Sequence, residues 1–298
     1  MLPYAPAHVP RFAPKGTHRR RKRRLNSKYF VSNDIRHNGE NMKIIICGAA
    51  GRMGQAIAAL MKADKTFEII GAFEFDGSTA IGSGSPAIRS IKEIEKFLPQ
   101  ADAVVDFTNP EASMKNLETA SKFKVPVVLG TTGLSEQQKA KVMEISKNIP
   151  VVMSPNMSVG INLLFKLVKE TAEKVPDYDI EIVELHHNKK KDAPSGTAAK
   201  LAEIAAKAVG RDIAECGVYG RHGIIGERTK NEIGVMAVRA GDIVGDHTVY
   251  FAGAGERIEI THRAHSRDTL ASGAVRAAKW IAGKKPGLYD MQDVLGLK

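Results

Sequence analysis

The sequence predicts an α/β protein with a doubly wound parallel sheet, followed by a second domain of the α+β class. Between Met42 and Met153, short β-branched runs alternate with amphipathic helical segments. Such alternation predicts buried parallel strands joined by right-handed crossovers. The first strand is followed by a glycine-rich turn, and beyond Tyr219 the pattern becomes rich in strands separated by glycine-containing turns. These three observations place a parallel α/β half before a strand-rich half.

The first half begins with a β-branched run over 42–48, which is typical of a strand buried on both faces. A helix is expected over 52–64, because its apolar residues recur at spacings of three and four. The later strands are expected at 68–74, 101–107, 126–129 and 150–153, and the helices between them at 91–98, 110–123 and 135–147.

In the second half, a helix over 161–174 precedes a longer strand over 179–187. Small and hydroxyl residues in Ala193–Thr197 favour a helix start, so the next helix should extend to about Val209. The remaining elements are expected as strands at 232–239, 246–252 and 256–262 and a final amphipathic helix at 268–282.

The charge is concentrated at one end of the chain. The 298 residues are 43% hydrophobic and carry a net charge of +11, of which residues 1–41 hold +8 and the rest only +3. No run approaches the roughly 18 apolar residues of a membrane span. The two cysteines, Cys47 and Cys216, form neither a disulfide framework nor a zinc-site spacing. We therefore expect a soluble cytoplasmic protein without a metal site.

Residues 1–41 are expected to be a basic, disordered extension with one of three origins. They could be translated from a start site upstream of Met42, form an organelle transit peptide that directs the protein to a plastid, or bind nucleic acid. The segment lacks an amphipathic pattern and is poor in serine, which favours the first origin over a transit peptide.

The turn Gly48-Ala-Ala-Gly-Arg-Met-Gly54 lies between the first strand and the first helix, as in Rossmann-like folds. Glycines allow a pyrophosphate to approach the helix N-terminus, although a simple tight turn would have the same pattern. Glu74 ends the second strand, where an acid usually accepts hydrogen bonds from the ribose hydroxyls. Because Phe75 follows it, with no cation there for a 2′-phosphate, the sequence predicts NADH over NADPH, although Arg52 could reach a phosphate.

Two further turns follow predicted strands at their carboxyl ends, where ligands of such sheets bind. They are Gly130-Thr-Thr-Gly133 and Ser154-Pro-Asn-Met157. Their small residues could pack on the nicotinamide and its ribose, or the turns could simply be loops.

The segment from Glu184 to Thr197 contains two adjacent histidines, three lysines and a Ser-Gly-Thr helix start. Adjacent strand residues point to opposite faces, which argues against His186 and His187 being twin ligands of one metal. The lysines form either a solvated turn or, with the exposed N–H groups of the helix start, a carboxylate site. A neighbouring histidine would then supply a proton donor that titrates near neutrality.

Together, Gly48–Gly54, Gly130–Gly133, Asn156-Met-Ser-Val-Gly160 and Glu184–Thr197 resemble the 4-hydroxy-tetrahydrodipicolinate reductase (dihydrodipicolinate reductase) family of lysine biosynthesis. The likeness runs from Met42 to about Leu297. It implies an NAD(P)H-dependent oxidoreductase of the diaminopimelate route that passes a hydride to a cyclic, unsaturated dicarboxylate after loss of its hydroxyl as water.

The resemblance also implies site residues. His186 would be the proton donor and acceptor and Lys190 a proton-donating lysine. Substrate would be held by His187, Ser195, Gly196, Thr197 and Arg267. The cofactor would contact Gly48, Ala49, Ala50, Gly51, Arg52, Met53, Glu74, Gly130, Thr131, Thr132, Ser154, Pro155, Asn156 and Met157.

For the architecture, the resemblance implies that residues 42–157 and 267–298 form the dinucleotide-binding domain. Residues 158–266 would form a substrate-binding domain whose sheet assembles a homotetramer, with a hinge that closes on substrate. Two other functions stay open: another NAD-dependent reductase of a small dicarboxylate, and a non-catalytic nucleotide-binding module with a nucleic-acid arm. The second would not need the paired histidines or Lys190.

Overall fold

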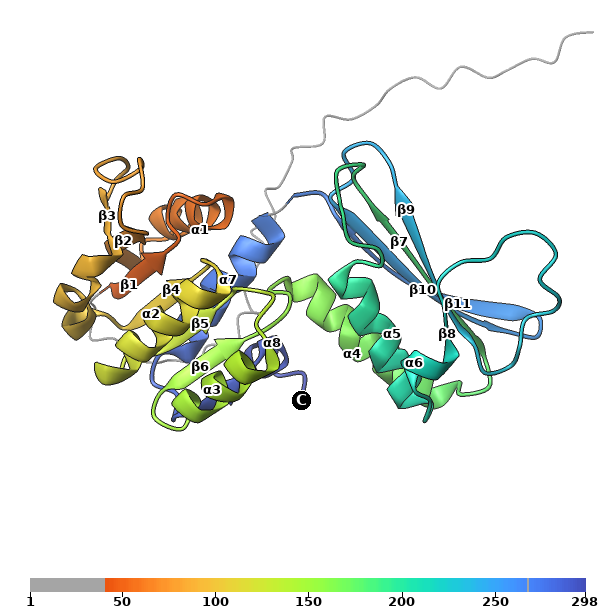
Figure 1. The fold of residues 1–298 in the computed structure, drawn as a ribbon. Coiled ribbons are helices and arrows are strands. Elements are labelled where there is room, and N and C mark those ends of the chain that lie inside the picture. The colour runs from red at the N-terminus through yellow and green to blue at the C-terminus, as the bar shows by residue number, and fades with distance from the viewer. Residues whose placement is uncertain (1–40, 267) are drawn as a thin grey trace, which may run out of the picture. The chain divides into compact units, whose positions relative to one another are not determined.

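The computed structural model describes residues 41–266 and 268–298 (Figure 1). The predicted basic extension, apart from Asn41, and the predicted substrate residue Arg267 lie outside the described residues. No helix in the described part of the chain is long and apolar enough to cross a membrane.

The first sheet has seven parallel strands in the order β12-β6-β5-β4-β1-β2-β3. The strands are β1 (Met42–Cys47), β2 (Phe67–Glu74), β3 (Ile88–Ser90), β4 (Ala103–Asp106), β5 (Val127–Leu129), β6 (Pro150–Met153) and β12 (Gly287–Tyr289). The helices that accompany it are α1 (Arg52–Ala63), α2 (Pro110–Lys122), α3 (Glu136–Ser146), α7 (Asp268–Ile281) and α8 (Met291–Leu295). This sheet confirms the predicted doubly wound fold.

Strand β1 is buried on both faces, as its β-branched run predicts. Ile44 and Ile46 pack into a core that includes residues of α1 and α7, whereas Ile45 and Cys47 pack into a core that includes residues of α2 and α3. Successive side chains of a strand point to opposite faces, so one strand supplies the centre of both cores.

The second sheet is mixed, with the order β11-β10-β7-β9-β8, which confirms the α+β class. It comprises β7 (Asp179–His186), β8 (Gly217–Val218), β9 (Ile233–Arg239), β10 (Gly245–Gly253) and β11 (Glu256–Ala264). Helices α4 (Val159–Lys174) and α5 (Gly196–Ala208) pack on one face of it, and α6 (Ile213–Cys216) follows α5 (Figure 1). The buried face of β7 carries Ile180, Ile182, Glu184 and His186, so it is apolar at its start and polar at its end.

The structure corrects some local predictions. The segment predicted as a helix over 91–98 forms two short 3₁₀ helices, Ile91–Lys96 and Leu98–Gln100, with Pro99 in the first turn of the second one. The strand predicted to reach His187 ends at His186, and the N–H of His187 donates to the carbonyl of Ile243 instead. The short elements β3, β8, β12, α6 and α8 lack periodicity of their own and were not foreseen.

Candidate active site

The glycine turn after β1 is built so that side chains at two positions would collide with backbone. Gly48 has a φ of +80°, and a Cβ there would lie 2.5 Å from the carbonyl oxygen of Phe107. A Cβ on Gly54 would lie 2.1 Å from the carbonyl oxygen of Gly48. Helix α1 begins at this turn with Gly51 as its N-cap and no side-chain cap. Its first N–H groups are therefore available for an anion such as a pyrophosphate.

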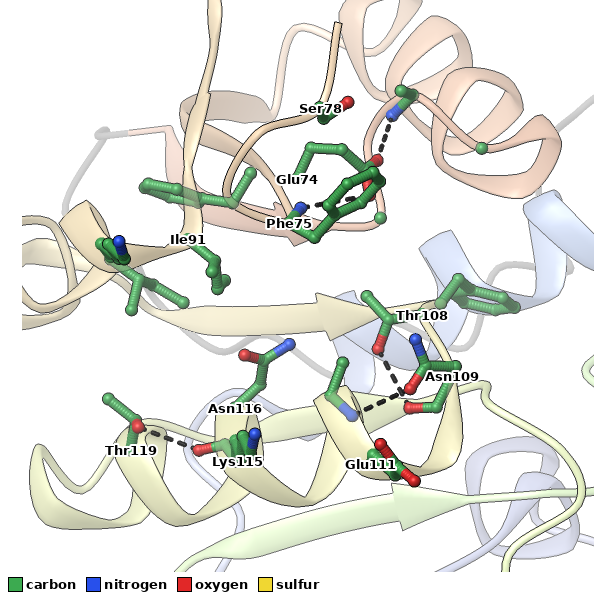
Figure 2. A pocket seen from close by; sticks show the side chains of 18 of the residues that line it. Glu74, Phe75, Ser78, Ile91, Thr108, Asn109, Glu111, Lys115, Asn116 and Thr119 are labelled. Carbon is green, nitrogen blue, oxygen red and sulfur yellow. Dashed lines mark hydrogen bonds between the residues drawn. The ribbon is translucent and has the colours of Figure 1, made fainter. Parts of the chain in front are cut away.

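A cavity of about 800 Å³ opens beside this turn (Figure 2). One wall carries Glu74 and Phe75, and the other carries Thr108, Asn109 and polar residues of α2. The Oε2 atom of Glu74 accepts a hydrogen bond from the N–H of Ala50 at 3.0 Å. Because a carboxylate offers about four acceptor positions, Glu74 can still accept from ligand hydroxyls. The size and lining of the cavity fit a dinucleotide.

The predicted cofactor residues are distributed over different places. Gly48, Ala50, Gly51 and Glu74 line the 800 Å³ cavity. Ser154 and Pro155 line a separate cavity of about 280 Å³, and Asn156 lines a third of about 150 Å³. The others, Ala49, Arg52, Met53, Gly130, Thr131, Thr132 and Met157, line none of these three.

Sequence reasoning missed the buried carboxylate of Asp106 at the end of β4. Asp106 is fully buried and accepts hydrogen bonds from the side chains of Thr108 at 2.7 Å, Ser113 at 2.8 Å and Asn116 at 2.7 Å. The hydroxyl of Thr131, after β5, donates to it at 3.3 Å. One acid thus joins the loops after β4 and β5 to α2. An acid that ends an apolar strand is the only signal the sequence offered for it.

The cavity of about 150 Å³ contains the strongest candidate for proton transfer. It is lined by the histidines His186, His247 and His262, together with Thr197 from the first turn of α5. Asn156, after β6, donates to the hydroxyl of Thr197 at 3.2 Å. A small cavity lined by several imidazoles and hydroxyl groups suits a compact, charged substrate.

The other predicted substrate residues occupy defined positions around this cavity. Ser195 is buried and caps α5, and its hydroxyl lies 3.1 Å from Nε2 of His247. The ammonium of Lys190 donates to the carboxylate of Asp192 at 2.8 and 2.9 Å and does not line the cavity. Gly196 and the half-buried His187 are likewise not among its lining residues. The structure therefore brings His186 and Thr197 together and leaves Lys190 on the adjoining loop.

His247 and His262 were not singled out from the sequence. They lie opposite one another in the antiparallel pairing of β10 and β11, and His247 also lies opposite Glu184 of β7. Only the strand register brings these residues together, and register cannot be read from the separate strands. Among the described residues, no group of three or more His, Cys, Asp or Glu side chains could hold a metal ion.

Burial makes His247 a source of acid sensitivity. Desolvation, with the nearby His186, lowers the pKa of His247 to about 3. The folded protein therefore resists protonation of this side chain, while the unfolded chain takes up the proton near pH 6.5. The free energy of unfolding is therefore highest above pH 6.5 and decreases as the pH falls towards 3, because over this range the proton binds to His247 only in the unfolded chain. Between pH 7.5 and 5.0 we expect this effect to lower the free energy of unfolding by about 2 kcal/mol.

Urea unfolding at the two pH values measures this loss. In the His247→Gln variant, the change in the free energy of unfolding between the two pH values should be smaller by about 2 kcal/mol, whatever the stability of the variant at pH 7.5. The exposed His222→Gln serves as the matched control and should keep the pH dependence of the parent. An unchanged pH dependence in His247→Gln would rule out this residue as the cause.

Comparison with known families gives two matches that together cover nearly all the described chain. The family model described as "Dihydrodipicolinate reductase, N-terminus" matches residues 42–157, and that described as "Dihydrodipicolinate reductase, C-terminus" matches residues 160–295.

Individual relatives agree with the family models. The 4-hydroxy-tetrahydrodipicolinate reductase of Syntrophotalea carbinolica is 52% identical over 266 residues, which cover 86% of this chain and 100% of that protein. The enzyme of the same name from Desulfotalea psychrophila is 53% identical over 265 residues, covering 86% and 98%. Among solved structures, a dipicolinate-bound dihydrodipicolinate reductase from Paenisporosarcina sp. TG-14 is similar in fold. It has a TM-score of 0.70 at 22% identity and covers 85% of this chain and 98% of that chain.

Proposed function

The chain belongs to the dihydrodipicolinate reductase family, and we propose that it reduces 4-hydroxy-tetrahydrodipicolinate, by way of dihydrodipicolinate, to tetrahydrodipicolinate. Family membership confirms the predicted NAD(P)H-dependent oxidoreductase. The observation that carries the proposal is that both halves of the chain match the two halves of one reductase family. The glycine-turn cavity and the histidine cavity support it from the geometry.

The residues of the histidine cavity fit the proton side of such a reduction. A bound reduced nicotinamide supplies the hydride, and its addition to a conjugated imine builds negative charge on the substrate. We assign His186, which lines this cavity and is 9% exposed, to deliver the proton that neutralises this charge. At the start of α5 the N–H of Ser195 already donates to Glu184, so the N–H groups of Gly196 and Thr197 would hold a substrate carboxylate at the helix N-terminus.

We also assign Lys190, His187 and Arg267 to substrate binding, as the family resemblance implies. Lys190 is assigned as a second proton donor and carboxylate partner. Its ammonium is paired with Asp192, so it reaches substrate only after that pair opens. The side chains of Lys190 and Asp192 are 20% and 60% exposed, so water can readily replace the contact between them.

Turnover of freshly prepared dihydrodipicolinate, followed by the loss of NADH absorbance, tests the proposed reaction directly. We expect NADH oxidation that depends on both the enzyme and dihydrodipicolinate. Oxidation with another small unsaturated dicarboxylate, but none with dihydrodipicolinate, would assign the chain to a different reaction.

We further propose that NADH is the preferred cofactor. Glu74 provides acceptors for ribose hydroxyls, and the neighbouring Phe75 is 64% exposed and uncharged. Lys92 also lines this cavity, but its ammonium lies 2.5 Å from the carboxylate of Asp76. Lys115 of α2 lines the cavity as well, on the wall that carries Thr108 and Asn109.

Phe75→Arg should shift the cofactor preference towards NADPH. An arginine at this position can pair with a 2′-phosphate, so we expect the ratio of kcat/KM for NADPH to that for NADH to rise about tenfold, the equivalent of about 1.4 kcal/mol. Steady-state kinetics with both cofactors measure it, and Phe75→Leu controls for loss of the ring. A parent enzyme that already prefers NADPH would overturn the proposed preference.

The remaining assignments follow the family. We propose residues 42–157 and 267–298 as the dinucleotide-binding domain and 158–266 as the substrate-binding and oligomerisation domain. We also propose a cytoplasmic homotetramer that acts in lysine biosynthesis. The pairing of β12 with β6 supports the inclusion of the C-terminal segment in the first domain.

A further inference from the structure

The carboxylate of Glu184 is fully buried and lies directly behind His186. Its Oε2 atom is 2.5 Å from Nδ1 of His186. Both residues belong to β7 and, two positions apart, face the same side of the sheet. The carboxylate therefore contacts the imidazole at Nδ1 and leaves Nε2 available for another partner.

The opposite nitrogen of His186, Nε2, lies next to Gly245. A Cβ on Gly245 would lie 2.9 Å from Nε2 of His186, so the ring occupies space that a side chain would otherwise fill. Gly245 and His186 both line the 150 Å³ cavity. The ring of His247 packs edge-on against that of His186, with centroids 5.2 Å apart and planes at 75°. The imidazole is thus held by Glu184, Gly245 and His247, and its ring lines the cavity.

Arg239, at the end of β9, keeps Glu184 charged. Its Nη1 and Nη2 atoms donate to the two oxygens of Glu184 at 2.9 and 2.8 Å, and Nη2 also donates to the carbonyl of Asp192 at 2.6 Å. Burial alone would raise the pKa of Glu184, but the hydrogen bonds from Arg239, His186 and the N–H of Ser195 hold that pKa below its ordinary value. Glu184 therefore remains a carboxylate.

The same carboxylate also positions the start of α5. Its Oε1 atom accepts from the N–H of Ser195 at 3.0 Å. With His186 and the two contacts from Arg239, Glu184 receives four hydrogen bonds, which fill the acceptor positions of a carboxylate. One buried side chain therefore fixes both the proposed proton donor and the helix start that would hold a substrate carboxylate.

We propose that Glu184, held ionised by Arg239, is a positioning residue that keeps a proton on Nδ1 of His186 and presents Nε2 to the substrate. A carboxylate cannot donate, so the facing Nδ1 carries its hydrogen in the imidazolium and in the neutral ring alike. The imidazolium loses its proton from Nε2 to the substrate, and the neutral ring that remains keeps its proton on Nδ1. The inference rests on the proposed function for the identity of the substrate, but the tautomer it assigns does not depend on turnover.

Imidazole NMR of the parent protein, without substrate, tests the assignment first. We expect neutral His186 to be the Nδ1–H tautomer, read from the ¹⁵N shifts and couplings of its ring. An Nε2–H tautomer in the parent would overturn the proposal before any variant is made.

The Glu184→Gln variant then tests whether Glu184 positions the imidazole of His186 or only stabilises the fold. The oxygen of the amide should remain with the N–H of Ser195 and Nη2 of Arg239, which can only donate. Its NH₂ group then replaces the oxygen that accepted from Nη1 of Arg239 and faces Nδ1 of His186, so the neutral ring reverses to the Nε2–H tautomer. We expect kcat to fall about 10- to 100-fold, with the dissociation constant for NADH changed less than twofold. Retention of the Nδ1–H tautomer, or of the parent kcat with the tautomer reversed, would contradict the proposed role.

Glu181→Gln is the matched control. Glu181 lies on the same strand but on the opposite face, and it accepts hydrogen bonds from two arginines, Arg221 and Arg228, where Glu184 accepts from one. This variant should lose a comparable ion pair yet keep the tautomer of His186 and the parent kcat. If the parent shows the Nδ1–H tautomer but no turnover of dihydrodipicolinate, the proposed function fails while the positioning assignment stands.

Discussion

Replacement of His186 with alanine is expected to lower kcat by about 10² to 10⁴, the range typical of a lost general acid or base. The side chain lines the small histidine cavity and is not among the residues that line the cavity beside the glycine turn, so NADH binding should change little. Steady-state turnover of dihydrodipicolinate and fluorescence titration of NADH give the two quantities separately.

The control for His186→Ala is the exposed histidine His222, whose replacement by alanine should leave both quantities near those of the parent. Near-normal turnover in His186→Ala would remove this residue from the proton-transfer role. A parallel loss of NADH affinity would indicate a structural defect instead.

Gly54→Ala should weaken NADH binding by about 100-fold or more. The added Cβ would lie 2.1 Å from the carbonyl oxygen of Gly48. Because this oxygen belongs to the backbone and cannot rotate away, the turn must be displaced relative to the N-terminus of α1. Because the proposed pyrophosphate site consists of these backbone N–H groups, a small displacement removes several hydrogen bonds together. The NADH dissociation constant measures the effect.

Gly51→Ala gives a graded comparison in the same turn. Its Cβ would lie 3.2 Å from the same carbonyl oxygen, and its φ of −68° suits any residue. The loss of NADH affinity should therefore be much smaller than for Gly54→Ala. Equal losses in the two variants would show that collision with Gly48 is not the cause, and circular dichroism checks that both remain folded.

The fold class could be predicted from the sequence because its signals are local. The buried run from Met42 to Cys47 and the periodicity of the helices do not depend on distant residues, and nearly all the long elements were placed within two residues. The edge strands β3 and β12 could not be foreseen, because a three-residue strand is defined by its neighbour in the sheet. The segment predicted as a helix at 91–98 instead forms two 3₁₀ helices, and Pro99, directly after the predicted end, lies in the first turn of the second one.

The candidate site was predicted where its residues are contiguous and missed where the fold assembles it. The stretch from Glu184 to Thr197 indicated His186 and the Ser-Gly-Thr helix start directly. In contrast, His247, His262 and Arg239 come from separate strands, and their place beside His186 depends on strand register. Asp106 was missed because its partners are neutral hydroxyls and an amide, which form no charge pattern along the chain.

The return of the C-terminal segment to the first sheet has a consequence for synthesis of the protein. The core on the α1 side of β1 contains residues of α7 and α8 that are translated more than 200 positions after Met42. Until those residues leave the ribosome, the apolar surface of Ile44, Ile46, Ile57 and Met61 has no cover from α7. A nascent chain of which only the first half has left the ribosome would therefore expose this surface, which could bind chaperones or aggregate. The first sheet to begin emerging is thus the last to be completed.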